Sequence, residues 1–434
     1  SIDQWKNWAN KGALSKAVVN HQDLFTADGR NGPLTYEVEL YQGCVRFKRG
    51  CKFCIEPKKG IPIWREEQDI IDEVNLAIEN GVQNIRLGGA TDVYTYKAEG
   101  VLDLEYPIPN PEPISDLLFG LRENENLQIL HVDNGNPSII AENLGPSSEI
   151  TKAMIDTLSD GAVLSFGLES ADPLVHSTNW LNCDPKQLIS AISHINDYGR
   201  ERGLRGLPKL LPGLNFIAGL NGETASSYQM NLKLLQGIRN KGLLLRRINI
   251  RQVEGQGFQD IPEKIFKEFK ETVRNTIDKP LLEELFPFGS IIRDVWWESH
   301  NNRIRDPKQV IDIEHRDISI YGKSGITFGR QIGAYPILTG IPYLLPLETK
   351  SDVIITGHGM RSISAVEIGL DINNVTQNQL SAIPGLGVKG AWKVISKRAI
   401  KLSKNNEKIT SVSEAFTSAG VNMPELADRI LVVK

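Results

Sequence analysis

Short runs of β-branched and other apolar residues alternate with longer segments of helical period between residues 35 and 252, and this alternation constrains the fold most. In the segment 65–81, for example, Ile70, Val74 and Ile78 recur on one helical face before Gly81. Six strands, each followed by a helix, predict an α/β fold with parallel strands and right-handed crossovers. A full eight-stranded barrel needs two further units, so we expect a partial (β/α)6 barrel of the TIM type. The expected strands are Thr35–Leu40, Asn84–Leu87, Leu127–Val132, Ala162–Phe166, Leu214–Ala218 and Arg247–Gln252.

The sequence beyond this core changes character twice, which indicates separate domains. Residues 301–368 are dense in Gly, Pro and β-branched residues and predict a small β-barrel-like domain, whose turns around Lys323 and Arg330 would contact phosphates. The pattern becomes helical again over residues 369–434. With an N-terminal helical extension at 1–33 and the partial barrel at 34–300, we expect four parts in all.

The overall charge and the cysteine count limit the possible classes of function. The 434 residues carry a formal net charge of −4, so any nucleic-acid contact must come from local basic patches. No apolar run approaches the ~18 residues of a membrane span, and the first residues lack a signal-peptide pattern. Four unevenly spread cysteines do not form a disulfide framework, so we expect a cytoplasmic protein without a membrane partner.

Three of the four cysteines lie on one short segment directly after the first expected strand. Cys44, Cys51 and Cys54 have the spacing C-x6-C-x2-C. Three thiolates can hold a zinc ion or three irons of a [4Fe–4S] cube. Structural zinc needs a fourth ligand, and the next cysteine is Cys183. Three cysteines without a fourth leave one iron open for a small molecule, and a structural zinc knot remains the alternative.

This segment resembles the cluster-binding loop of the radical S-adenosylmethionine (SAM) superfamily. The family's usual spacing is C-x3-C-x2-C, often with an aromatic residue before the third cysteine. The chain keeps the C-x2-C and has Phe53 at the aromatic position, but its first gap is six residues wide. The resemblance covers roughly residues 34–255. It implies that Cys44, Cys51 and Cys54 hold a [4Fe–4S] cluster that cleaves SAM reductively to a 5′-deoxyadenosyl radical.

Further motifs follow later strands where this family has its SAM contacts. The segment RLGGATD ends the second expected strand and resembles the family's Gly-Gly-Glu turn, with Ala90 in place of the acid. The segments SFGLESADP and LNFIAGLNGET end the fourth and fifth strands and resemble the segments beside the ribose and the adenine. The resemblance therefore implies SAM contacts from Gly88, Gly89, Ala90, Thr91, Asp92, Glu169, Ser170, Asn215, Ile217 and Gly219.

The C-terminal region contains a second informative segment, TQNQLSAIPGLGVKGAWKVISKRAIKLSK. Gly385 and Gly387 permit a tight turn between two short helices, and the second helix is rich in lysine. The segment resembles the helix-hairpin-helix motif, in which amides near a helix N-terminus bind a backbone phosphate. The resemblance implies nucleic-acid contacts from Gly385, Gly387, Lys389, Lys393, Lys397 and Arg398. A protein–protein helical hairpin with a solvated lysine face is the alternative.

The combination of this core with such a C-terminal motif resembles a mostly archaeal family. We expect an enzyme that modifies a nucleoside in tRNA or rRNA, with RNA rather than DNA as partner and an electron donor such as ferredoxin. Repair or modification of DNA and a non-enzymatic zinc-holding protein are the alternatives. Methylthiotransferases resemble the core but carry a second cluster on three N-terminal cysteines, and residues 1–43 contain none. Cys183 is a structural thiol, a catalytic thiol or a further ligand.

Overall fold

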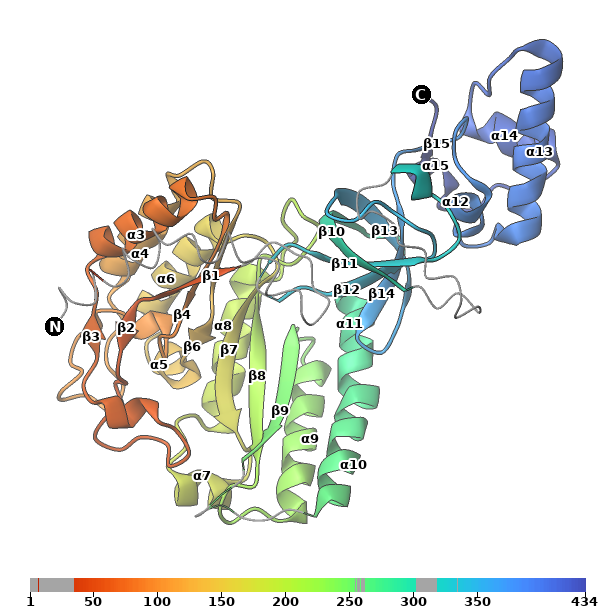
Figure 1. Ribbon diagram of the computed structural model, residues 1–434. Coiled ribbons are helices and arrows are strands. Elements are labelled where there is room, and N and C mark those ends of the chain that lie inside the picture. The colour runs from red at the N-terminus through yellow and green to blue at the C-terminus, as the bar shows by residue number, and fades with distance from the viewer. Residues whose placement is uncertain are drawn as a thin grey trace.

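The computed structural model describes residues 35–253, 262–301, 318–333 and 335–434, together with Asn7, Gly255 and Phe258. The expected extension at 1–33 lies outside these residues apart from Asn7. Along the described chain an α/β core is followed by a closed barrel of antiparallel and parallel strands and then by a group of helices (Figure 1). None of the helices among the described residues is long and apolar enough to cross a membrane.

The core contains two parallel sheets, and the six strands expected from the sequence are confirmed. The first sheet has the order β1-β4-β5 and the second the order β6-β7-β8-β9. All their pairings are parallel, as the strand–helix alternation predicts. The strands are β1 (Tyr36–Glu39), β4 (Asn84–Gly88), β5 (Ile129–Val132), β6 (Asn134–Gly135), β7 (Ala162–Glu169), β8 (Leu210–Ala218) and β9 (Arg247–Gln252).

Asp133 joins the two sheets, since it lies between β5 and β6 and bonds to both neighbours. Its backbone N–H donates to the carbonyl oxygen of Leu87 at 3.1 Å, and its own carbonyl accepts from the N–H of Ser165 at 2.8 Å. One stretch of chain thus pairs with β4 on one side and with β7 on the other. The carboxyl ends of strands from both sheets therefore meet along one edge.

Amphipathic helices connect and cover these strands (Figure 1). In α8, Asp184 caps the first turn through a capping box with Gln187, and Leu188, Ile192 and Ile195 are buried on one face. The helices of the core are α3 (Glu67–Glu79), α4 (Pro111–Arg122), α5 (Pro137–Glu142), α6 (Leu144–Thr157), α7 (Pro173–Asn179), α8 (Pro185–Gly199), α9 (Ala225–Asn240), α10 (Glu263–Val273), a π-helical turn (Arg274–Asp278) and α11 (Lys279–Leu285). Short elements complete the core, namely the antiparallel pair β2 (Tyr41–Gln42) and β3 (Ile63–Trp64) and the 3₁₀ turns η2 (Glu56–Lys59) and η3 (Val93–Thr95).

The expected β-rich domain is a closed five-stranded barrel with the order β10-β11-β12-β14-β13. Its first strand begins at Ile291, within the range 34–300 that the sequence assigned to the core. The expected turn around Arg330 is wrong, because Gly329, Arg330 and Gln331 are the last three residues of a strand. The strands are β10 (Ile291–Asn301), β11 (Ile326–Gln331), β12 (Leu338–Ile341), β13 (Lys350–His358) and β14 (Ser362–Glu367), with the 3₁₀ turn η5 at Ile318–Ile320.

The C-terminal helices are tied to each other by a short parallel pair of strands. This pair joins β15 (Leu370–Asp371) to β16 (Leu431–Val432), so the last residues return to the first residues of this region. Between them lie α12 (Gln377–Ser381), α13 (Gly387–Asn405), α14 (Val412–Ala419) and α15 (Ala427–Ile430). They form the end of the molecule beyond the barrel (Figure 1).

The barrel is bonded directly to the core. The N–H of Arg293 donates to the carbonyl of Arg205 at 3.1 Å, and His358 Nε2 lies 2.6 Å from the carbonyl oxygen of Phe286. From the loop between β11 and β12, the Tyr335 hydroxyl donates to the Asp133 carboxylate. The barrel therefore reaches the strand that joins the two core sheets.

Candidate active site

The three thiols lie on a loop whose backbone is folded tightly against itself. The N–H of Cys44 donates to the carbonyl of Gly60 at 3.2 Å, and the N–H of Cys54 donates to the carbonyl of Cys51 at 3.1 Å. Gly43 has a φ of 97°, and a Cβ at this position would lie 2.8 Å from the Gly60 oxygen. The start of the loop therefore requires glycine.

The environment of the thiols is half-buried and contains one close cation. Burial raises the pKa of all three thiols, that of Cys51 to about 11. Arg46 opposes this effect, because its Nη1 donates to Cys51 Sγ at 3.1 Å and to the Trp180 carbonyl at 3.0 Å. Free thiols are protonated here, and a bound metal would replace those protons.

A cavity of about 360 Å³ lies beside the thiols, within the usual size range of small-molecule sites. The three cysteines and Phe53 line it from the loop, and the other lining residues come mostly from strands of both sheets and the turns that follow them. They include Gly89, Ala90, Thr91, Asp92, Asn134, Gly135, Asn136, Ser165, Gly167, Glu169, Asn182 and Asn215.

The turn after β4 is held by a buried tyrosine and a buried acid. The Tyr41 hydroxyl accepts from the N–H of Asp92 at 2.9 Å and donates to the Asp92 carbonyl at 2.7 Å. The Oδ1 atom of Asp92 accepts from the N–H groups of Tyr94 at 3.0 Å and Asn136 at 2.9 Å. Burial raises the pKa of the Asp92 carboxyl to about 7. The turn backbone facing the cavity, with Gly89 at a φ of 71°, is thereby fixed in place.

Glu169 has an unusual backbone at the end of β7. Its φ is 67°, and the register of β7 against β8 shifts between Gly167 and Glu169. Burial raises the pKa of its carboxyl to about 8, and its Oε2 atom is buried without a hydrogen-bond partner. A polar group of a ligand in the cavity would satisfy this oxygen.

Four of the predicted SAM contacts lie outside the lining of this cavity. Gly88 is the last residue of β4, and Ser170 is buried, with its Oγ accepting from the Asp172 N–H at 3.2 Å. Ile217 packs in a small apolar cluster with Phe53. The Gly219 N–H donates to Glu223 Oε2 at 2.6 Å.

The sequence analysis missed three asparagines that line the cavity, namely Asn134, Asn136 and Asn182. Asn134 Nδ2 donates to the Ala90 carbonyl at 3.1 Å, and Asn182 Nδ2 donates to Asn136 Oδ1 at 2.6 Å. The sequence could have indicated two of them, because Asn134 and Asn136 follow the third expected strand almost directly. Polar side chains at the carboxyl ends of parallel strands are typical of ligand sites.

Cys183 is fully buried in the main core and does not belong to the cavity lining. Its Sγ donates to the Asp184 carbonyl at 3.2 Å, and burial raises the pKa of its thiol. This placement fits a structural thiol better than a reactive one.

Within the described parts of the chain, no group of three or more His, Cys, Asp or Glu side chains is placed so that it could hold a metal ion. A [4Fe–4S] cube instead offers each thiolate its own iron. Three thiols on one wall of an open cavity, with Arg46 beside them, fit the donor set of such a cube.

The predicted nucleic-acid residues lie around the start of α13. Gly385, in the turn between α12 and α13, has a φ of 87°, and Gly387, the first residue of α13, has a φ of 64°. Lys389, Lys393 and Lys397 are exposed along the helix. Trp392, which the sequence analysis did not single out, is 59% exposed on the same helix.

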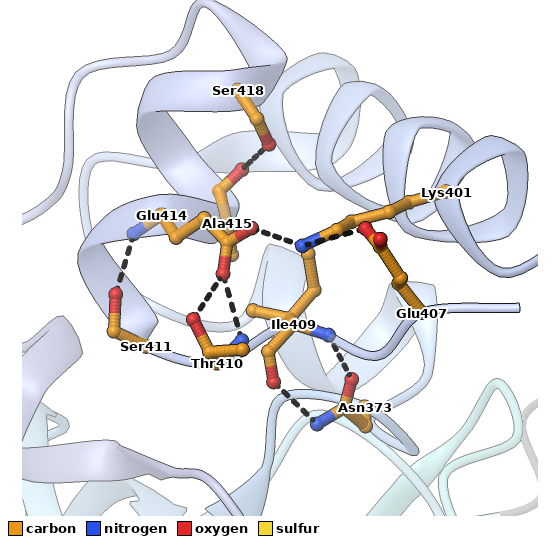
Figure 2. A network of polar contacts seen from close by, with 9 residues as sticks. All are labelled: Asn373, Lys401, Glu407, Ile409, Thr410, Ser411, Glu414, Ala415 and Ser418. Carbon is orange, nitrogen blue, oxygen red and sulfur yellow. Dashed lines mark hydrogen bonds and ion pairs between the residues drawn. The ribbon is translucent and has the colours of Figure 1, made fainter. Parts of the chain in front are cut away.

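Two basic side chains farther along α13 are engaged within the protein. Arg398 Nη1 donates to the carbonyls of Ile372 and Val375, each at 2.9 Å. Lys401 is paired with Glu414 and lies 3.9 Å from a Glu407 oxygen, as Figure 2 shows. The exposed lysines of α13 are therefore Lys389, Lys393 and Lys397, together with Lys404 in the last turn.

Comparisons with known proteins connect the chain to archaeal and bacterial relatives. No family model matches it. It is 36% identical to an uncharacterised protein of Methanocaldococcus jannaschii over 76% of this chain and 59% of that one. It is also 36% identical to one of Archaeoglobus fulgidus, over 80% of this chain and 63% of that one. The chain thus spans less than two thirds of the length of these relatives.

A more distant relative has a named activity. The chain is 26% identical, over 50% of its length and 43% of the other, to a tRNA-2-methylthio-N(6)-dimethylallyladenosine synthase of Geobacter sulfurreducens.

Two solved structures are similar to parts of the chain. One is the radical SAM methyltransferase TsrM of Kitasatospora setae with a SAM analogue bound. Its alignment with this chain has a TM-score of 0.36 at 12% identity and covers 50% of this chain and 36% of TsrM. The radical SAM enzyme HemN of Escherichia coli has a TM-score of 0.35 at 13% identity, covering 83% and 78%.

Asp92 provides a test of the turn that borders the cavity. Its pKa is raised from 3.8 to about 7, so the neutral carboxyl is favoured in the folded protein, and ionisation lowers stability as the pH rises through this range. Asp92→Asn keeps the Oδ1 acceptor. We expect its stability relative to the parent to rise by roughly 2–3 kcal/mol between pH 5 and pH 8, because about two pH units of the shifted range lie between these values. Asp92→Ala leaves two N–H groups without an acceptor and should cost about 2 kcal/mol at pH 5.

Urea unfolding at the two pH values measures both effects. Asp116→Asn is the matched control, because Asp116 is exposed on α4. An Asp92→Asn variant with the same stability difference from the parent at pH 5 and pH 8 would contradict the buried, neutral carboxyl.

Proposed function

We propose that the chain is a radical SAM enzyme in which Cys44, Cys51 and Cys54 hold a [4Fe–4S] cluster at the mouth of a partial (β/α)6 barrel. The observation that carries this proposal is the shared cavity, which the three thiols, the turn after β4 and Glu169 line together. When bound, the cluster supplies the electron that splits SAM into methionine and a 5′-deoxyadenosyl radical. Ligand sites at the carboxyl ends of parallel strands are the rule for such barrels.

The residues of the cavity match the polar groups of SAM. Carbonyls of the turn Gly89–Asp92 can accept from the methionyl amino group, and the side-chain amide of Asn134 holds the Ala90 carbonyl. With a pKa near 8, Glu169 is largely protonated at neutral pH and can donate to a carboxylate or a ribose oxygen. We assign Gly88, Ser170, Ile217 and Gly219 to support of these strand ends.

We further propose that the substrate is a nucleoside in tRNA or rRNA and that α12, the glycine turn and α13 act as a helix-hairpin-helix. The exposed lysines 389, 393 and 397 beside exposed Trp392 support this, since cations and an aromatic ring together suit RNA. The named relative that acts on tRNA adds support. A cytoplasmic electron donor such as ferredoxin, which is acidic, would dock on the basic thiol loop near Arg49 and Lys52.

The cluster proposal predicts the behaviour of single cysteine variants. After anaerobic reconstitution with iron and sulfide, the parent protein should be brown and should release 5′-deoxyadenosine from SAM. Cys51→Ser and Cys54→Ser should lower iron content severalfold and abolish SAM cleavage, because each removes one iron ligand. Cys183→Ser is the matched control and should retain both, since Cys183 lies in the core. A colourless parent protein, or a Cys183 variant that alone loses iron, would refute the assignment.

The RNA proposal predicts a change in the modified nucleosides of the source organism. Deleting the gene should remove or alter one nucleoside in total tRNA or rRNA, as measured by mass spectrometry of enzymatic digests. The chain with Cys51→Ser should not restore it, whereas the parent chain should. A change confined to DNA nucleosides would replace RNA with DNA as the substrate, and unchanged RNA profiles would refute RNA modification.

The lysine surface predicts a salt-dependent loss of binding. Replacing Lys389, Lys393 and Lys397 together with Gln should weaken RNA binding about tenfold at moderate salt and reduce the slope of log K against log[salt] by about 2. Fluorescence anisotropy with labelled RNA measures both quantities. Lys401→Gln is the control, because Lys401 is already paired with Glu414. Equal affinities for the triple variant and the parent would show that this surface has another partner.

A further inference from the structure

A second cavity, of about 380 Å³, lies between β9, α11 and the barrel. Its lining includes four arginines from three different places in the chain: Arg246 and Arg247 at the start of β9, Arg330 on β11, and Arg361 beside β14. Asp278 is the one acidic residue among the lining side chains. The cavity therefore has an excess of positive charge.

The four guanidinium groups differ in how many hydrogen bonds and ion pairs they make within the protein. Arg246 Nη2 donates to the Tyr335 carbonyl at 3.0 Å, and Arg330 is paired with Glu298. Arg247 and Arg361 are exposed at the cavity. The Arg247 guanidinium lies 5.0 Å from the centre of the Tyr335 ring, and its Nε donates to Asn249 Oδ1 at 2.8 Å. These contacts orient Arg247 and leave its terminal N–H groups available to a ligand.

The arginine-lined cavity adjoins the thiol cavity through two pairs of polar side chains. Asn215 lines the thiol cavity and Asn249 lines the arginine cavity, and Asn249 Nδ2 donates to Asn215 Oδ1 at 2.8 Å. Ser165 and Tyr335 form a second such pair, with their hydroxyl oxygens 3.4 Å apart. These two contacts link the linings of the two cavities directly.

We propose that the arginine-lined cavity binds a phosphate group of the nucleotide that the enzyme modifies, through Arg247 and Arg361. Guanidinium groups bind phosphate oxygens in bidentate fashion, and a partly enclosed site strengthens this interaction. Anchoring the phosphate here would direct the attached nucleoside past Tyr335 and Asn249 toward the cavity of the radical source. Radical transfer needs such fixed proximity. The inference rests on the proposed function and names the substrate's anchoring group.

Binding of adenosine 5′-monophosphate and of a labelled single-stranded RNA tests the proposal. Both are measured on the full chain, without SAM, for the parent and for Arg247→Gln, Arg361→Gln and the double variant. We expect the double variant to bind both ligands at least about tenfold more weakly. Adenosine, which lacks the phosphate, should compete poorly. Arg247→Lys keeps a charge but not the planar fork, so its affinity should be intermediate.

Arg200→Gln is the matched control, because Arg200 is exposed after α8 and lies outside both cavities. Measuring RNA binding in the background of the triple lysine variant removes the contribution of α13. If the monophosphate binds through the arginines and RNA does not compete with it, the phosphate comes from a free nucleotide. Equal affinities for the double variant and the Arg200→Gln control would overturn the proposal.

The outcome is separable from that of the proposed function. The same binding measured with the Cys51→Ser variant does not depend on the cluster. Arginine-dependent binding by a protein that never cleaves SAM would refute the radical chemistry and retain the phosphate site. SAM cleavage together with arginine-independent binding would refute the phosphate site and retain the radical chemistry.

Discussion

The arrangement of the molecule depends on the two backbone hydrogen bonds of Asp133. They join the strand that ends the first sheet to the strand that begins the second, so residues from both sheets face one cavity. The side chain of the same residue accepts from the Tyr335 hydroxyl of the barrel domain. One residue thus connects both sheets with the second domain. Thr91 and Asp92 from the first sheet and Glu169 and Asn215 from the second reach the same cavity for this reason.

The two cavities differ in the charged side chains that line them. Around the thiols, burial raises the pKa of Cys51, Asp92 and Glu169, so the cavity disfavours negative charge until a cation or a metal enters it. In the arginine cavity, burial likewise raises the pKa of Asp278 to about 6 and lowers the pKa of Arg246 to about 10. An anionic group suits the second cavity, because four arginines and one aspartate line it. The neutral pairs Asn215–Asn249 and Ser165–Tyr335 lie between them.

Most of the core could be predicted from the sequence, because the strand–helix alternation is local. The start of β8 could not, since Pro212 and Gly213 lie inside that strand and usually indicate its end. The thiol loop was found by its spacing, whereas Asn134 and Asn136 were missed because they are common loop residues. No short sequence motif indicated the arginine cavity. Arg247, Arg330 and Arg361 are far apart in the sequence, and only the packing of the barrel on the core brings them together.

The contacts between barrel and core also explain why the barrel is more than an appended module. Gly206 packs so tightly against β10 that a Cβ would lie 2.0 Å from the Ile291 carbonyl oxygen, and Arg205 bonds to the backbone at both Arg293 and Ile332. These contacts fix the β11–β12 loop, and with it Tyr335, against β7. A barrel that only bound nucleic acid would not need to place a tyrosine beside the strand that carries Glu169. If the arginine cavity binds the substrate as proposed, the barrel forms part of the lining of that site.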